Sequence, residues 1–98
     1  MTKYTVFVVY TYEEDTTYIA KLMLRSTHIL FSTLEEAIEA TCSEIKETYG
    51  KFPGFKLYPP KIDTTIGGLP HVTEGYFTCK YIGNSSATRH YIYINTID

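Results

Sequence analysis

The fold is decided by residues 32–50, STLEEAIEATCSEIKETYG, which hold the clearest helix pattern in the chain. Ser32 or Thr33 can serve as the N-cap, because each is followed three residues later by a glutamate, as in a capping box. Gly50 follows the last periodic residue and is expected to end the helix as a C′ glycine. We therefore predict an amphipathic helix over residues 34–49. Its apolar stripe recurs at helical spacing and consists of Leu34, Ile38, Thr41, Cys42, Ile45 and Tyr49. Of these, we expect Leu34, Ile38 and Ile45 to be buried.

Strand patterns lie on both sides of this helix. Residues 3–12 and 16–25 read as two strands around a polar turn at residues 13–15, which predicts an N-terminal hairpin. Residues 72–82 and 88–97 read as a second hairpin around a turn at residues 83–86, with apolar and aromatic residues alternating in the last strand.

The segment between the helix and the second hairpin, residues 51–70, has a different character. Its four prolines and three glycines forbid long regular elements, but it is too apolar for a free linker. We expect an irregular arm that contains one short strand and packs against the sheet. The predicted fold class is α+β: an antiparallel sheet of two β-hairpins with one amphipathic helix packed on one face, in a single domain of residues 1–98.

The period-two pattern of the strands assigns the sheet residues to two faces. The face under the helix is predicted to carry Val6, Val8, Leu22, Leu24, Phe77, Cys79, Ile92 and Ile94. The opposite face is predicted to carry Phe7, Val9, Ile19, Met23, Tyr76, Tyr91 and Tyr93. This second face is too apolar to be fully wet, so we expect either the arm or a second copy of the chain, in a homodimer, to cover it.

Composition excludes several classes of protein. The chain has 98 residues, is 44% hydrophobic and 20% charged, and so is typical of one packed domain rather than a disordered segment. Its net charge of −2 argues against a general polyanion binder. We find no apolar run long enough to span a bilayer and no signal-peptide pattern. Cys42 and Cys79 are expected to be reduced core thiols, which favours a cytoplasmic protein without membrane contact.

Catalytic or metal chemistry is not expected. No two of His28, His71 and His90 have ligand spacing, and neither cysteine belongs to a CxxC or CxxH pair. Cys79 and His90 lie in neighbouring predicted strands, but any cross-strand pair could meet in this way. The Gly67-Gly68 pair precedes no helix and is interpreted as a turn rather than a phosphate-binding loop. We therefore predict a protein that is not an enzyme and that uses no catalytic residue, metal or cofactor.

Tyrosine offers one functional hypothesis, because the chain has 10 of them. Tyr91 and Tyr93 alternate on one strand in phase with Arg89, and Lys80 lies on the partner strand. Exposed aromatic rings beside cations bind bases and phosphates, which predicts a nucleotide or single-stranded nucleic-acid binding module. Packing in a core or an interface is the commoner use of tyrosine and remains an alternative.

The outer face of the helix offers the second hypothesis. It carries five glutamates, at positions 35, 36, 39, 44 and 47, but only one cation, Lys46. We expect Glu36, Glu39 and Glu47 to bind a partner protein with a basic surface, although a solvated acidic face is the commoner meaning of such a pattern. The favoured prediction is a small non-enzymatic binding or inhibitor protein that acts through protein–protein contact. By analogy of size and charge, it could be a phage-type antagonist of a host defence or nucleic-acid enzyme.

Overall fold

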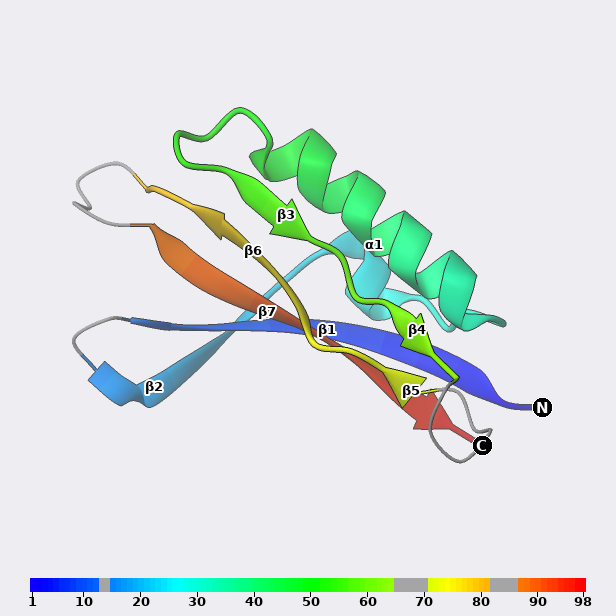
Figure 1. Cartoon of the computed structure of the whole chain (residues 1–98). Helices are drawn as coiled ribbons and strands as arrows, with labels where there is room; N and C mark the ends of the chain where they lie inside the picture. The colour runs from blue at the N-terminus through cyan, green and yellow to red at the C-terminus, as the bar shows by residue number, and fades with distance from the viewer. Residues whose placement is uncertain (13–14, 65–70, 82–86) are drawn as a thin grey trace.

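The computed structural model describes residues 1–12, 15–64, 71–81 and 87–98, and the side chains of residues 11–12 and 15–19 are not among those described. It confirms the predicted α+β class, with one helix packed on an antiparallel sheet (Figure 1). Of the predicted turns, residues 13–14, 67–68 and 83–86 lie outside the described part, as does the side chain of Ile19. Asp15, expected in the first turn, already pairs with Tyr12 as a strand residue. The elements in chain order are β1 (Lys3–Tyr12), β2 (Asp15–Leu22), the 3-10 helix η1 (Arg25–His28), α1 (Leu34–Tyr49), β3 (Lys56–Tyr58), β4 (Ile62–Asp63), β5 (His71–Val72), β6 (Gly75–Cys79) and β7 (Thr88–Ile97).

The main sheet has five strands in the order β2-β1-β7-β6-β3. The two predicted hairpins are present, and they join through an antiparallel pairing of β1 with β7 that runs from Lys3–Ile97 to Tyr10–His90. This pairing places the first and last strands in the centre of the sheet, with α1 across one face (Figure 1).

The bounds of α1 agree with the prediction. Thr33 is the N-cap, and its Oγ1 accepts a hydrogen bond from the Glu36 N–H at 3.1 Å. Gly50 follows the last helical residue, as predicted, but its backbone is right-handed, with φ −60° and ψ −19°, and does not adopt the left-handed conformation common for a glycine at this position. Space, not handedness, requires glycine there, because a β-carbon would collide with the Lys46 carbonyl oxygen.

The buried face of α1 differs slightly from the predicted stripe. Ile45 is fully buried as expected, together with Ala37, Thr41 and Cys42. Leu34 and Ile38 are only half-buried, so the prediction that they are buried is wrong for these two residues. Ala37 is fully buried in the core instead. We attribute this to its size, because a small side chain lets a helix approach the layer beneath it closely.

The described strand residues lie on the two sheet faces as predicted, but Met23, predicted on the second face, follows the end of β2 and is exposed. Beneath α1 the core contains Val6, Val8, Leu24, Phe77, Cys79 and Ile92, with Leu22 and Ile94 packed against them. Cys42 and Cys79 are both free and buried, as expected for core thiols. No helix in the described part of the chain is long and apolar enough to cross a bilayer.

Two predicted strands are shorter than expected. The second strand stops at Leu22, and the chain turns into η1, which the sequence pattern did not predict. The predicted strand at residues 72–82 is divided into β5 and β6. At the start of β6, Gly75 lies so close to the Pro60 ring that a β-carbon would collide with it, which explains the glycine at this position.

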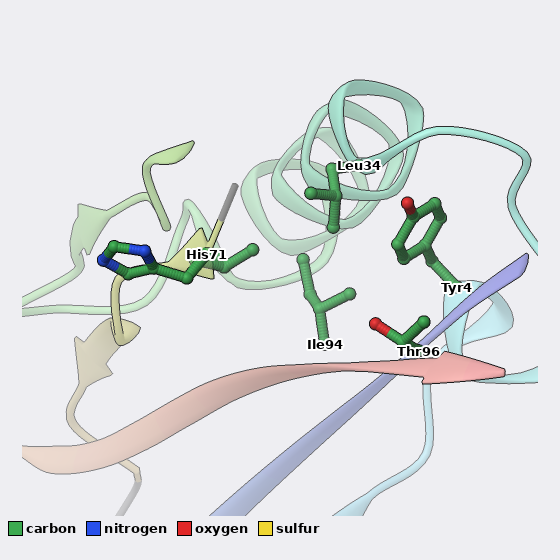
Figure 2. Close-up of a pocket in the computed structure, with 6 residues that line it drawn as sticks. Tyr4, Leu34, His71, Ile94 and Thr96 are labelled. Atoms are coloured by element: carbon green, nitrogen blue, oxygen red, sulfur yellow. The ribbon is translucent and has the colours of Figure 1, made fainter. Parts of the chain in front are cut away.

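The arm does not cover the second sheet face. Its strand β3 pairs with β6 and extends the sheet at its edge. The small β4–β5 sheet lies on the helix side, where His71 and Val72 line the same pocket as Leu34 of α1 and Ile94 (Figure 2). The arm does pack against the core, through Phe52, Phe55 and Leu57, but with two short strands instead of the one expected. The alternative that it covers the second sheet face is wrong for the described residues, and the homodimer stays a prediction.

Candidate functional site

The six predicted site residues lie on two opposite sides of the molecule. Glu36, Glu39 and Glu47 are exposed on α1. Arg89, Tyr91 and Tyr93 belong to β7 and alternate with buried His90 and Ile92, so they lie on the sheet face away from the helix. The two groups cannot form one site, and each surface has to be considered separately.

The first surface is a shallow groove beside α1, which we call the acidic groove. It is lined by Phe31, Glu36, Glu39, Ala40 and Ser43. Phe31 is buried and held against β1, where it exchanges two backbone hydrogen bonds of 2.9 Å with Tyr4. Neither groove glutamate takes part in an ion pair with any residue that the structure describes. The groove therefore combines an apolar floor with carboxylates that have no cationic partner there.

Two large apolar side chains just before Phe31 in the chain are exposed. Ile29 and Leu30, which precede Phe31, are 46% and 58% exposed. They belong to the connection between η1 and α1, which runs past the edge of the sheet (Figure 1). Two adjacent large apolar residues on a surface, bordered by polar groups, are typical of an interaction site.

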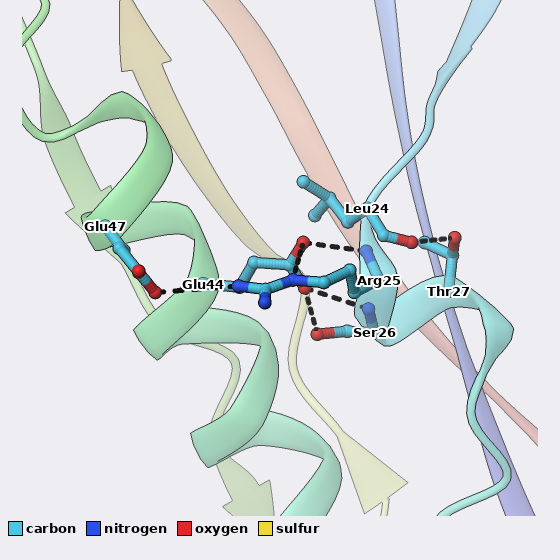
Figure 3. A network of polar contacts seen from close by, with 6 residues as sticks. All are labelled: Leu24, Arg25, Ser26, Thr27, Glu44 and Glu47. Carbon is cyan, nitrogen blue, oxygen red and sulfur yellow. Dashed lines mark hydrogen bonds and ion pairs between the residues drawn. The ribbon is translucent and has the colours of Figure 1, made fainter.

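The five glutamates of α1, at positions 35, 36, 39, 44 and 47, form what we call the acidic stripe. Its C-terminal end has a structural role (Figure 3). Glu44 is half-buried, and its carboxylate accepts hydrogen bonds from the Arg25 N–H at 2.7 Å, the Ser26 N–H at 2.8 Å and Ser26 Oγ at 2.6 Å. Burial works to raise the pKa of Glu44, but these hydrogen bonds outweigh it and lower the pKa. Glu44 thus holds η1 to α1, and the expectation that it belongs to a solvated outer face is wrong.

Glu47 has a cationic partner that the sequence did not indicate. Its carboxylate lies 3.6 Å from Arg25 Nη2, and both side chains are exposed. Arg25 lies on a different element, so the helix sequence alone did not reveal this cation. The uncompensated part of the acidic stripe is therefore its N-terminal half, which includes Glu36 and Glu39.

The second surface is the sheet face opposite α1, which we call the open sheet face. Its strand register aligns one row of residues across all five strands: Tyr58, Tyr76, Tyr91, Val9 and Lys21. A shorter row pairs Tyr93 with Phe7, and their rings are stacked at 5.1 Å between centroids. Tyr58 and Tyr76 are stacked at 4.6 Å. Tyr58 and Tyr93 remain 46% and 37% exposed, so this face presents aromatic rings to solvent.

Cations accompany the rings. The Arg89 guanidinium carbon lies 4.7 Å from the Tyr76 ring centroid, and Lys21 Nζ lies 5.9 Å from that of Phe7. Lys56 and Arg89 both lie opposite Thr78 in the register, so they share a row beside the tyrosines. Among the described side chains of this face there is one carboxylate, that of Glu74, whose Oε1 accepts a hydrogen bond from the Tyr93 hydroxyl at 3.1 Å. Positive charge predominates among the described residues of this face.

A buried polar cluster lies on the helix side. Tyr81 Oη is 2.7 Å from His90 Nε2, and His90 stacks on Phe77 with ring centroids 4.3 Å apart. Burial lowers the pKa of His90 to about 4 and raises the pKa of the Cys79 thiol. A buried neutral thiol is a poor nucleophile, and both Cys79 and His90 are inaccessible to a substrate. This cluster is therefore suited to packing rather than to cysteine–histidine catalysis.

One further pocket lies between the start of α1 and the ends of β1 and β7 (Figure 2). Its lining is largely apolar or hydroxylic, and its single ionisable imidazole, that of His71, lies 3.7 Å from the Asp63 carboxylate. Within the described ranges, no three His, Cys, Asp or Glu residues converge on a possible metal site. This pocket offers no group of residues with an evident chemical role.

Comparisons of the chain with protein-family models, with curated proteins and with solved structures gave no match. Function must therefore be argued from the two surfaces themselves. The sequence interpretation missed Phe31 in the groove, and it placed Tyr58 in the arm rather than on the open sheet face. Tyr76 and Phe7 were assigned to the correct face, but nothing in the sequence revealed their stacking partners.

Proposed function

We propose that this protein is a small non-enzymatic binding protein, and that a basic segment of a partner protein occupies the acidic groove. The observation that carries this proposal is that Glu36 and Glu39 line one groove with apolar Phe31 and Ala40. Exposed Ile29 and Leu30 directly precede Phe31 in the chain. Long cationic side chains fit such a surface well. Their methylene stems can pack on Phe31 and Ala40 while their charged ends reach the carboxylates.

The charge of the groove favours an inhibitory role. An acidic surface attracts the basic sites with which other proteins hold nucleic acid, and its field accelerates the encounter. A protein bound at such a site excludes the polyanion. We therefore propose that the protein acts as an antagonist of a nucleic-acid or defence enzyme, as the size and charge of the chain suggested. We also propose that it acts in the cytoplasm.

The test begins with a photo-crosslinking amino acid at Ser43, which lines the groove and is exposed. A crosslinked protein from a lysate of the native host is then purified, and its affinity is measured by titration calorimetry. Glu39→Lys should weaken its binding at least about tenfold, with a stronger effect at low salt. Glu35→Lys is the matched control, because Glu35 is also exposed and its reversal makes the same charge change, but Glu35 does not line the groove. Equal effects of the two reversals, or no effect of either, would contradict the proposal.

A further inference from the structure

We propose that the open sheet face binds single-stranded nucleic acid, independently of the partner in the acidic groove. The first argument is the geometry of the rings. Tyr58 and Tyr93 are the most exposed rings of this face, and each is stacked on one described aromatic partner, Tyr76 and Phe7 respectively. A base can extend either stack, because every base has a π-face and stacking on aromatic side chains tolerates any sequence.

The second argument is the position of the cations. Lys56 and Arg89 form a row beside the tyrosine row, and Lys21 ends the tyrosine row on β2. Phosphates of a strand whose bases contact the rings would meet these side chains. The net charge of −2 does not oppose this, because the glutamates of α1 lie on the other side of the sheet.

The third argument concerns the alternative occupant, a second copy of the chain. Symmetric pairing of this face would bring the cations of both copies into one interface, where Glu74 is the one carboxylate that the described residues supply. Like charges facing each other oppose such pairing. Charge complementarity therefore favours an anionic ligand over a homodimer. A duplex fits less well, because its bases are stacked internally and cannot reach the rings.

The experiment uses fluorescein-labelled 12-mers of single-stranded DNA and RNA and the matching DNA duplex, with binding followed by fluorescence anisotropy. Single strands should bind at least about tenfold more tightly than the duplex. If three cations contact phosphates, the logarithm of the affinity should fall with the logarithm of the salt concentration with a slope of about −2.

Two matched pairs of variants locate the site. Arg89→Gln should weaken single-strand binding severalfold and reduce the salt slope by about 0.7. Lys46→Gln removes the same charge from an exposed position on α1 and should change affinity less than about twofold. The double variant Tyr58→Ala/Tyr93→Ala should weaken binding at least about fivefold, whereas Tyr4→Ala, which removes a ring from the helix side of the sheet, should change affinity less than about twofold. Thermal unfolding checks that each variant is folded.

Three results would overturn the proposal. The first is no binding to any single strand at low salt. The second is equal affinity for duplex and single strands without any effect of the tyrosines, which would indicate non-specific attraction of polyanions. The third is a dimer in light scattering that Tyr58→Ala/Tyr93→Ala converts to a monomer, which would identify the face as an interface between copies. None of these results bears on the acidic groove, so the two proposals can fail separately.

Discussion

The phenol oxygen of Tyr81 lies 2.7 Å from Nε2 of His90, inside a cluster of aromatic rings on the helix side of the sheet. His90 is fully buried, and burial is the main reason that its pKa falls to about 4. The imidazole is therefore neutral in the folded protein at neutral pH. In the unfolded chain it has an ordinary pKa of about 6.5.

Acid should therefore unfold the protein through His90. Between about pH 6.5 and pH 4 the unfolded chain binds a proton that the folded chain does not, so the stability present above this range is lost as the pH falls. The expected loss of unfolding free energy is on the order of 3 kcal/mol. Urea unfolding at several pH values measures it. His90→Phe should abolish the slope between pH 6.5 and 5 whatever its own stability, and an unchanged slope would contradict the assignment.

Glu44 should matter far more for stability than Glu47. Glu44→Ala leaves the Arg25 and Ser26 N–H groups without their acceptor and should cost about 2 kcal/mol of unfolding free energy. Glu47→Ala breaks only an exposed ion pair with Arg25 and should cost less than about 0.5 kcal/mol. Chemical denaturation of both variants at pH 7 makes the comparison, and similar losses would show that Glu44 does not hold η1.

The same glutamate predicts a second acid-sensitive range. The lowered pKa of Glu44 means that its contribution is present above the unfolded value, about 4.3, and is lost as the pH falls through the folded value. The pH dependence that remains in His90→Phe should therefore weaken further when Glu44→Gln is added. Unfolding curves below pH 5 on the single and double variants check this, and identical curves would exclude Glu44 as a contributor.

Truncations along α1 should follow burial rather than the apolar pattern. Ile45→Ala empties a fully buried position and should cost about 2–4 kcal/mol. Ile38→Ala removes the same atoms from a half-buried position, and its cost should be clearly smaller. Equal losses in thermal or urea unfolding would mean that Ile38 packs more tightly than its exposure indicates.

Reversal of Glu36, Glu39 and Glu47 to Lys should separate binding from stability. All three side chains are exposed, so thermal unfolding should change little. Affinity for a partner in the acidic groove should fall by orders of magnitude, and most of the loss should come from Glu36 and Glu39 because Glu47 already faces Arg25. Calorimetry on the three single reversals measures how much affinity each glutamate contributes. If Glu47→Lys caused the largest loss, the partner would bind nearer to η1 than we propose.

The helix and the two sheet faces were predictable because local chemistry specifies them. Thr33 caps α1, Gly50 follows it, and the alternation along β1 and β7 assigns each side chain to a face. Contacts between distant segments were not predictable in this way. The acceptor of the Ser26 N–H is a glutamate 18 residues later, and no periodicity links the two. The role of β3 as an edge strand depends on pairing with β6, which three residues between prolines do not reveal.

The same uneven predictability applies to the candidate sites. The sequence identified Glu36, Glu39, Arg89, Tyr91 and Tyr93 as candidates, because their residue types and their spacing lie within single elements. It did not identify Phe31 as the floor of a groove, because that position follows from the backbone pairing with Tyr4. Tyr58 was assigned to an irregular arm instead of the sheet, since its row with Tyr76 exists only in the assembled sheet.

The central pairing of β1 with β7 has a consequence for how the protein is made. These strands are the first and the last along the described chain. Their pairing joins the β1–β2 hairpin to the half of the sheet that contains β7, β6 and β3. During synthesis, β1 leaves the ribosome long before its main partner exists, so the sheet cannot close until β7 has emerged. Pairing between such distant segments also gives a high contact order, which slows folding. Until that closure, the apolar side of β1 is open to chaperones and to misassociation with other nascent chains.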